Sequence, residues 1–245
     1  MDLLNTGIFE IICADGIFAD GWAHYLLYVG LILFVMASSY LLGSLSSAII
    51  VSKAMFKDDV RNHGSGNAGL TNVLRTYGMG AAGLTLLGDL LKAALSVLIC
   101  AVIFGFEYNG GISLNGYCYL AGMCAVLGHV YPVFYGFKGG KGVLVTAAMA
   151  LILAPAVCAA LLLTFIIIVI ISGFVSLGSI IVAALFPIAT SLYSLLVGGG
   201  LELLTLIVTL FLGIFVIWCH RSNIKRLLSG SEKRISVGKK EKTDE

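Results

Sequence analysis

The chain of 245 residues is 59% hydrophobic and 11% charged, whereas roughly a quarter of the residues in a soluble domain are charged. Together with a mean hydropathy of +1.03, this composition excludes a soluble globular domain and indicates an integral membrane protein. The net charge of +2 is small, and we expect no nucleic-acid partner. The six cysteines are scattered, without a CxxC pair or a Cys/His ligand spacing, so we expect no disulfide framework, no metal site and no bound cofactor.

Residues 1–23 form an acidic leader that contains no Lys or Arg ahead of the first long apolar run. A cleavable signal peptide begins with basic residues, so we do not expect one here. The apolar side chains between Leu3 and Ile12 fit one side of a short helix that lies on the membrane.

Three long hydrophobic segments follow the leader, over about 24–52, 81–106 and 114–135. Each is longer than the roughly 17 residues that a membrane-spanning helix needs at minimum. A polar stretch that includes HGSGNAGLTNVLR separates the first two segments. We therefore expect three spanning helices in this part of the chain.

The stretch from Val143 to Cys219 contains one charged residue, Glu202. Pro155 and two breaks rich in glycine and serine interrupt it. The resulting apolar segments cover about 143–157, 158–173, 176–197 and 201–219. Because the first two are short, they form either two tilted crossings or one re-entrant pair.

The basic residues predict the orientation, because Lys and Arg accumulate in cytoplasmic loops. Of the 15 basic residues, all but Lys92 fall on one side of the predicted segments. Lys141 and Arg221 must then both be cytoplasmic, which requires an even number of crossings between them. Two crossings would leave much of the apolar chain outside a membrane span, whereas four crossings place all four apolar segments in the membrane. We expect an all-α integral membrane protein: a seven-helix bundle with the amino terminus outside, the carboxyl terminus in the cytoplasm and short polar cytoplasmic loops. Five crossings plus a re-entrant hairpin is the alternative.

On this topology the chain divides into three parts. They are an acidic extracytoplasmic leader (1–23), a transmembrane domain (24–228) and a polar cytoplasmic tail (229–245). The tail is mixed in charge, and we expect it to be disordered beyond about Ile235.

The first polar cluster on the predicted cytoplasmic side follows the first segment. Ser65 stands between Gly64 and Gly66, and either Ser65 or Asn67 fits the cap of a helix that starts near Ala68. Farther along that helix, three polar residues are spaced to share one face, and an arginine among them can bind a phosphate through two hydrogen bonds. These residues are Thr71, Asn72 and Arg75. A capped helix in a solvated loop is the alternative interpretation.

The second cluster is the lysine-glycine loop between the third and fourth segments, Lys138-Gly139-Gly140-Lys141-Gly142. Three glycines allow the backbone to turn its N–H groups into one concavity, and the following helix adds a positive N-terminus. The loop is not a Walker loop, because Gly142 stands where that motif needs Ser or Thr. Phosphate binding and a plain cytoplasmic turn are equally consistent with the loop alone.

The third cluster follows the last segment. His220 and Asn223 are three residues apart and point the same way on a helical end; a histidine titrates near neutrality and suits proton transfer or the orientation of a hydroxyl. A histidine in a basic membrane flank is the alternative. Ser176 and Ser179 are one helical step apart on the same side of the membrane, where small residues also serve helix packing.

Two ionisable residues fall inside the second segment. Asp89 and Lys92 would be costly in a membrane unless paired, and their spacing permits a pair. We interpret this pair as structural. His129 and Pro132, just before the lysine-glycine loop, are interpreted as packing at a helix end.

Three stretches together resemble the acyl-phosphate:glycerol-3-phosphate acyltransferases, the PlsY family of bacterial membranes. They are GSGNAGLTNVLR, GHVYPVFYGFKGGKGV and HRSNIKRLLSGSEKRI, and the resemblance covers about residues 38–235. One departure concerns the first helix, where the family's usual GSxPxG reads Gly43-Ser44-Leu45-Ser46-Ser47-Ala48. This chain therefore lacks the proline and the second glycine of that motif, and we expect the departure to affect the local shape of the helix and not the reaction.

The resemblance implies a multi-pass protein of the bacterial cytoplasmic membrane with its site on the cytoplasmic face. The reaction it implies moves an acyl chain from acyl-phosphate to the 1-hydroxyl of sn-glycerol-3-phosphate, giving lysophosphatidic acid and phosphate in the first step of phospholipid synthesis. Both substrates, membrane lipids and an upstream enzyme that forms acyl-phosphate are the expected partners. The catalytic residues it implies are Ser65, Arg75, Lys141, His220 and Asn223.

The remaining site residues are expected to bind substrate phosphate or, for Glu232, to have a structural role. The expected binding residues are Gly64, Gly66, Asn67, Thr71, Asn72, Lys138, Gly139, Gly140, Gly142, Ser176 and Ser179. Acyl-phosphate is already activated, so no protein nucleophile is needed, and the proton of the glycerol hydroxyl goes either to His220 or to the acyl-phosphate itself. We favour the second route.

Two other classes remain as rivals. An anion transporter would use the same basic loops as a gate, but it predicts polar residues deep in several helices and on both membrane halves. A non-catalytic lipid-binding protein would not need three glycine-rich or histidine-bearing clusters. No HxxxxD occurs in the chain, which disfavours acyltransferases that use a histidine-aspartate dyad.

Overall fold

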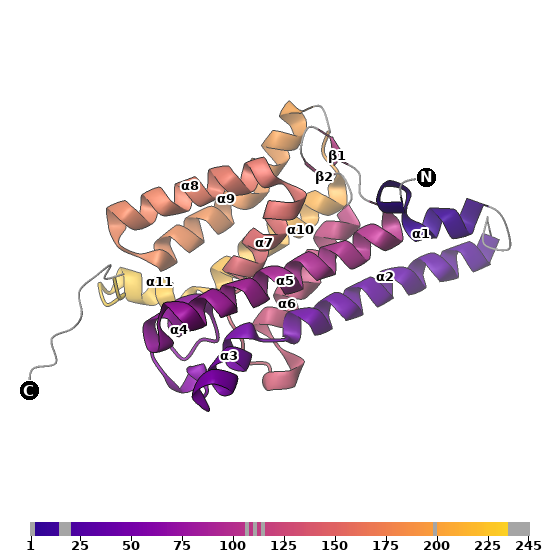
Figure 1. Cartoon of the computed structure of the whole chain (residues 1–245). Coiled ribbons are helices and arrows are strands. Elements are labelled where there is room, and N and C mark those ends of the chain that lie inside the picture. The colour runs from indigo at the N-terminus through magenta and orange to yellow at the C-terminus, as the bar shows by residue number, and fades with distance from the viewer. Residues whose placement is uncertain are drawn as a thin grey trace, which may run out of the picture.

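The computed structural model describes residues 3–14, 21–105, 108–109, 112–113, 116–197 and 200–234. Its long helices lie side by side along one axis (Figure 1). One end of this bundle carries α3 (Ser47–Phe56), α4 (Leu70–Tyr77) and α11 (Arg221–Leu228), and the opposite end carries α1 (Leu3–Ala14) with the strands β1 (Tyr108–Asn109) and β2 (Ile112–Ser113). The described chain therefore departs from the all-α prediction by one short antiparallel pair of strands.

The amino-terminal half packs around α6 (Gly116–Val130). Both α2 (Gly21–Ser44) and α5 (Met79–Phe104) lie against α6, and α1 packs on α5. The backbones of α2 and α6 approach closely because two glycines lie in their contact: a Cβ on Gly43 would lie 2.1 Å from the Ala125 oxygen, and one on Gly128 would lie 2.1 Å from the Tyr40 oxygen. Small residues allow such approach between helices in a membrane, where packing rather than hydrophobic exclusion drives association.

The predicted first segment, 24–52, is broken rather than continuous: α2 ends at Ser44 and α3 begins at Ser47. The break does not require the missing proline, because Lys92 of α5 stabilises it. The Lys92 ammonium donates to the carbonyl oxygens of Gly43 and Leu45, at 3.2 and 3.3 Å, and lies 2.9 Å from Asp89. The predicted Asp89–Lys92 pair is thus present, and it satisfies carbonyls that the end of a helix leaves without partners.

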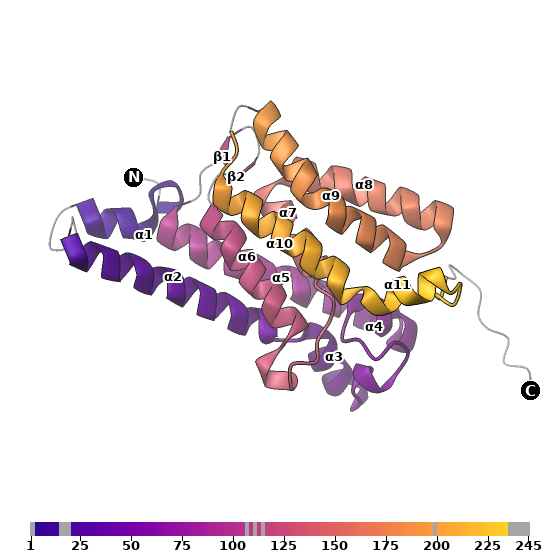
Figure 2. The ribbon, with the colours of Figure 1, turned by 180° about the vertical axis from the view of Figure 1, so that it is seen from behind.

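The carboxyl-terminal half consists of four apolar helices in succession, α7 (Val143–Leu153), α8 (Pro155–Ser172), α9 (Val175–Leu196) and α10 (Leu203–Cys219). Neighbours in the sequence pack against each other, α8 on α9 and α9 on α10 (Figure 2). Pro155 stands at the start of α8, where its missing N–H costs nothing, and Gly173 ends α8 in the left-handed conformation.

Within the described residues, five helical stretches are long and apolar enough to span a membrane, or six if α10 and α11, bent by 55°, count as one. The predicted segment 143–157 is shorter than expected, because α7 has 11 residues and so covers only about 16 Å of a hydrocarbon core of about 30 Å. The protein is therefore an apolar, mostly helical bundle of membrane type.

Candidate functional site

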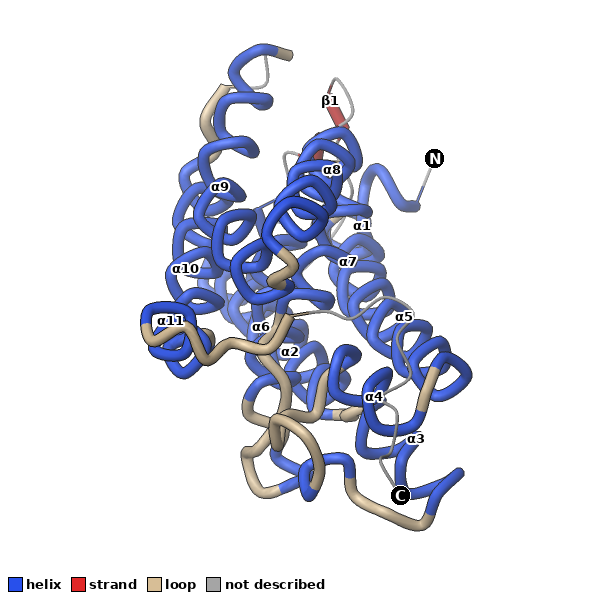
Figure 3. Tube along the Cα trace, turned by 90° about the vertical axis from the view of Figure 1, so that its left-hand side faces the viewer, coloured by secondary structure: helices blue, strands red, loops and turns tan. Residues whose placement is uncertain are grey.

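A cavity of about 880 Å³ lies where the three polar clusters meet. The loop segments around α3, α4 and α11 gather at the end of the bundle nearest the viewer in Figure 3. The polar part of the cavity wall includes most of the predicted site residues. They are Gly64, Ser65, Asn67, Thr71, Asn72, Arg75, Lys141, Gly142, Ser176, Ser179, His220, Asn223 and Glu232.

Asn72 holds the loop that carries Ser65. Its side chain is 2% exposed; its amide oxygen accepts from the Ser65 N–H at 3.1 Å, and its amide nitrogen donates to the carbonyls of Val60, His63 and Asn67 at 3.0 Å. Three carbonyl oxygens share the two amide hydrogens, so the amide nitrogen has no hydrogen left for a ligand. Asn72 therefore shapes the loop.

Gly64 is needed in this arrangement, because it has a φ of +58° and a Cβ there would lie 2.2 Å from Asn72 Oδ1. The predicted side-chain cap of the following helix is wrong: α4 begins at Leu70, and its N-cap is Gly69, with no side-chain hydrogen bond. The hydroxyl of exposed Ser65 is consequently not used as a cap.

The first polar loop is bonded to the lysine-glycine loop. The Arg61 guanidinium donates to the carbonyl of Tyr135 at 2.8 Å and to that of Lys138 at 3.3 Å, and the Ala68 N–H donates to the Gly139 carbonyl at 3.4 Å. Two segments about 70 residues apart in the chain are thus hydrogen-bonded to each other beside the cavity.

The glycines of the second loop serve packing more than anion binding. The N–H groups of Gly139 and Gly140 donate to the carbonyls of Val130 and His129, both at 3.1 Å, so they are not turned toward an anion. A Cβ on Gly140 would lie 2.1 Å from His129 Nε2. Gly142, with a φ of +83°, is the N-cap of α7, whose first-turn N–H groups lack partners within the helix.

The two lysines of this loop differ in their position relative to the cavity. Lys141 lines the cavity, whereas Lys138 is exposed and does not, and neither do Gly66, Gly139 and Gly140. The pKa of Lys141 is lowered to about 8, chiefly by burial and next by the nearby charge of Arg226, while Glu232 acts in the opposite direction. Lys141 is thus a half-buried ammonium that a bound anion would stabilise.

A chain of hydrogen bonds joins Lys141 to the carboxyl-terminal segment. Lys141 Nζ donates to Asn223 Oδ1 at 2.5 Å, and Asn223 Nδ2 donates to Glu232 Oε1 at 2.7 Å. Glu232 also accepts from Ser176 Oγ and from Arg226 Nε, each at 2.7 Å. Burial raises the pKa of Glu232, but the bonds from these three donors outweigh it and leave the pKa below its ordinary value. Glu232 therefore fixes the segment after α11 against α9.

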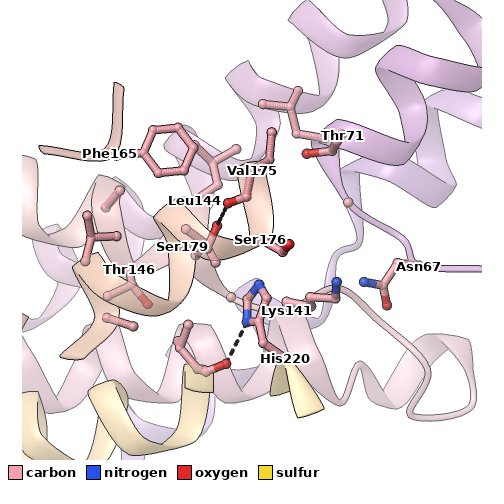
Figure 4. Close-up of a pocket in the computed structure, with 18 of the residues that line it drawn as sticks. Asn67, Thr71, Lys141, Leu144, Thr146, Phe165, Val175, Ser176, Ser179 and His220 are labelled. Atoms are coloured by element: carbon pink, nitrogen blue, oxygen red, sulfur yellow. Dashed lines mark hydrogen bonds between the residues drawn. The ribbon is translucent and has the colours of Figure 1, made fainter. Parts of the chain in front are cut away.

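His220 lies just past the end of α10, and its ring reaches the cavity beside Lys141 (Figure 4). Its Nδ1 lies 2.7 Å from the Val216 carbonyl oxygen; a carbonyl only accepts, so Nδ1 carries the proton and Nε2 carries the lone pair. The pKa of His220 is lowered to about 4, chiefly by burial. The imidazole is accordingly neutral at pH 7 and offers an acceptor at Nε2.

Away from Lys141 the cavity becomes apolar. Leu144 and Phe165 lie on the side of the cavity away from Lys141 and His220 in Figure 4, and the wall continues over α7, α8 and α9. Of the two predicted serines, Ser176 contacts Glu232 and Ser179 donates to its own helix at the Val175 carbonyl, 2.9 Å away. The cavity thus has a charged end and a long apolar part.

Sequence reasoning missed some lining residues. Arg226 could have been predicted from its spacing: it follows Asn223 by three residues, as Asn223 follows His220, which places it on the same side of a helix. Asp89 and His129 line the cavity as well, although their positions inside apolar segments indicated packing alone. For the apolar wall, no local pattern distinguishes a residue that faces a cavity from one that faces lipid.

Fold and site together define a polytopic membrane protein with a cationic end to a largely apolar cavity. A family model described as glycerol-3-phosphate acyltransferase matches residues 33–230. A glycerol-3-phosphate acyltransferase of Clostridioides difficile (strain 630) is 43% identical over 204 residues, which is 82% of this chain and 94% of that protein. One of Paraburkholderia phytofirmans is 41% identical over 212 residues, 86% of this chain and 94% of that one.

A solved structure is similar to most of the chain. The crystal structure of PlsY (YgiH), an integral membrane glycerol 3-phosphate acyltransferase, in its glycerol 3-phosphate form, has a TM-score of 0.72 and 35% identity, and the match covers 84% of this chain and 96% of that one. The chain therefore belongs to the glycerol-3-phosphate acyltransferase family of bacterial membranes that includes PlsY, as the sequence motifs predicted.

Proposed function

We propose that the protein transfers an acyl chain from acyl-phosphate to the 1-hydroxyl of sn-glycerol-3-phosphate, releasing lysophosphatidic acid and inorganic phosphate. The observation that carries this proposal is the position of the Lys141 ammonium at the charged end of the cavity, where all three polar loops meet and the apolar part begins. A phosphate at that end and a hydrocarbon chain along the apolar part match the two chemical halves of an acyl-phosphate. Solved structures of PlsY in glycerol 3-phosphate and lysophosphatidic acid forms support the assignment by similarity.

In this mechanism the protein mainly neutralises and positions two anionic substrates. Lys141, Arg75 and the first-turn N–H groups of α7 bind phosphate oxygens and gather the negative charge that develops on the acyl carbonyl and on the leaving phosphate. Ser65 and Asn67 contact the substrates from the first loop, beside the charge of Arg75. Lys138 has no part in this scheme because it does not reach the cavity.

The chemical step is a direct transfer. The glycerol hydroxyl attacks the acyl carbonyl carbon, the bond from that carbon to the phosphate oxygen breaks, and the hydroxyl proton passes to the departing phosphate. His220 Nε2 accepts the hydrogen bond of the hydroxyl and orients it, with Asn223 beside it. A base with a pKa of about 4 is poorly matched to removing a hydroxyl proton near neutral pH, which supports proton transfer to the substrate itself.

The comparison of two variants tests this role of His220. We expect His220→Ala to lose clearly less activity than Lys141→Ala, because orientation contributes less than charge neutralisation. An equal loss in the two variants would identify His220 as the base.

We further propose seven membrane crossings, with α7 and α10 completing the set, the amino terminus outside and the site facing the cytoplasm of a bacterial inner membrane. Support comes from the alternating direction of α7 to α10 in Figures 1 and 2 and from the basic residues on one side. The division into a leader (1–23), a transmembrane domain (24–228) and a tail (229–245) belongs to the same proposal.

An acyl-phosphate is reactive toward water, so an enzyme that forms it must act immediately upstream.

Purified protein in lipid vesicles, given acyl-phosphate and labelled glycerol-3-phosphate, tests the proposed reaction. We expect label to appear in lysophosphatidic acid together with one equivalent of phosphate. Exchange of label across the vesicle membrane without transfer to lipid would instead identify a transporter.

A further inference from the structure

Three buried ionisable side chains lie together beside the cavity and take no part in the mechanism described so far. Asp89 and Lys92 of α5 and His129 at the end of α6 are 1%, 4% and 4% exposed. Lys92 Nζ lies 2.9 Å from Asp89 Oδ1 and 2.8 Å from His129 Nδ1. Asp89 and His129 also line the cavity.

The contacts of Lys92 determine which nitrogen of His129 carries the proton. A carboxylate and two backbone carbonyls surround the Lys92 ammonium, and an ammonium has hydrogen-bond donors only. His129 Nδ1 must therefore accept from Lys92. In the neutral ring the proton is then on Nε2, which becomes a donor.

The donor at Nε2 lies next to the lysine-glycine loop. Nε2 is so close to Gly140 that a Cβ on that residue would lie 2.1 Å away, and Gly140 directly precedes Lys141. Within the part of the chain that the structure describes, Nε2 has no hydrogen-bond partner, whereas Nδ1 has Lys92. His129 lines the cavity, so a ligand held there can accept a hydrogen bond from this donor.

We propose that His129 is a further substrate-binding residue, which donates its Nε2–H to a phosphate oxygen of a substrate held by Lys141. Asp89 and Lys92 are positioning residues that keep the proton on Nε2. This proposal rests on the proposed function and adds a neutral donor to the charged groups of the site. The oxygen belongs to glycerol-3-phosphate or to acyl-phosphate, and the kinetic experiment separates the two.

Two substitutions separate a donor from a packing residue. His129→Asn keeps an amide near the Nδ1 position for Lys92 but has nothing at the Nε2 position, whereas His129→Gln carries an amide nitrogen near Nε2. We expect His129→Asn to lower kcat/KM at least tenfold and His129→Gln to recover most of that loss, with similar Tm values. A raised KM for glycerol-3-phosphate alone assigns the oxygen to that substrate, and a raised KM for acyl-phosphate alone assigns it to the donor.

Unchanged kinetics in His129→Asn, or equal losses in both variants, would overturn the proposal. An inactive wild-type protein would instead overturn the proposed function, so the two failures are distinguishable.

A spectroscopic measurement on the wild-type protein does not depend on whether the variants fold. The chain has four histidines, so the spectrum of 15N-labelled imidazole has few signals. The signal that is missing from the His129→Gln spectrum belongs to His129. We expect His129 to be protonated on Nε2 and its Nε2–H signal to shift when glycerol-3-phosphate or inorganic phosphate is added. A proton on Nδ1, or a signal unmoved by saturating amounts of both, would contradict the proposal.

Discussion

The ammonium of Lys141 donates to the amide oxygen of Asn223 at 2.5 Å, across 82 positions of the chain. Asn223 in turn donates to Glu232, which binds Ser176 of α9 and Arg226 of α11. The cation proposed to meet the substrate phosphate is thus held by a network that joins its loop to α9, to α11 and to the segment after α11. Its charge and position depend on parts of the chain that have no local relation to the lysine-glycine loop.

The two lysines of that loop provide a matched pair of substitutions. We expect Lys141→Met to lower kcat/KM for both substrates by about a hundredfold to a thousandfold, the usual cost of removing a group that stabilises developing charge. Lys138→Met removes the same charge from an exposed position outside the cavity and should change kcat/KM less than about threefold by the same reasoning. Similar losses in both variants, measured in vesicles, would contradict the assignment of Lys141.

The lowered pKa of Lys141 predicts a pH dependence. Burial favours the neutral amine, so the charged form that binds phosphate is present below a pKa of about 8 and is lost as the pH rises through that value. The kcat/KM for glycerol-3-phosphate should therefore fall above about pH 8 on a one-proton limb. Lys141→Arg should retain a low activity whose alkaline limb is absent up to pH 9.5, because a guanidinium stays charged. An alkaline limb that is the same in both proteins would assign the titration to another group.

Glu232 is expected to act on the site through Asn223. Glu232→Ala removes an acceptor shared by three donors and leaves buried polar groups unpaired. We expect a Tm lower by several degrees and a raised KM for glycerol-3-phosphate. Lys225→Ala is the control, because Lys225 is exposed on α11, the helix that carries Asn223, and does not line the cavity. A Glu232→Ala protein with the Tm and KM of the control would show that the network is not needed.

Gly140 allows us to test the packing of the second loop on His129. In Gly140→Ala the Cβ would lie 2.1 Å from His129 Nε2 and 2.9 Å from the Ala68 carbonyl oxygen, so both polar loops must move. We expect activity below about 1% of wild type, because small displacements of positioned groups cost catalysis steeply. Gly80→Ala is the control, since nothing lies within 4 Å of its Cβ, and it should keep full activity. A fully active Gly140→Ala would contradict the described packing.

The apolar segments could be predicted from the sequence because Gly and Pro interrupt them at the helix ends. The segment expected over 81–106 is α5, Met79–Phe104, and the one expected over 176–197 is α9, Val175–Leu196. The break between α2 and α3 could not be predicted, because it depends on Lys92, which lies 47 residues beyond Leu45. Tertiary contacts of this kind leave no local pattern.

In the site, too, features that depend on local spacing could be predicted, whereas features that depend on tertiary contacts could not. The spacing of His220 and Asn223 on one helical face was readable, and both are buried at the cavity. Asn72, Gly139 and Gly140 look like phosphate-binding residues in the sequence, but their polar groups bond to the protein's own backbone. Only the three-dimensional partners of an amide or a glycine N–H decide whether it faces a ligand.

The placement of the first and third polar loops on one side of the membrane is tested most directly by labelling cysteines placed there. Ser65→Cys and Asn223→Cys, in a background without the six natural cysteines, would be treated with a membrane-impermeant maleimide in inside-out and right-side-out vesicles. We predict labelling of both in inside-out vesicles only, and slower labelling of Ser65→Cys when glycerol-3-phosphate is present. Labelling of the two positions from opposite sides of the membrane would contradict the account.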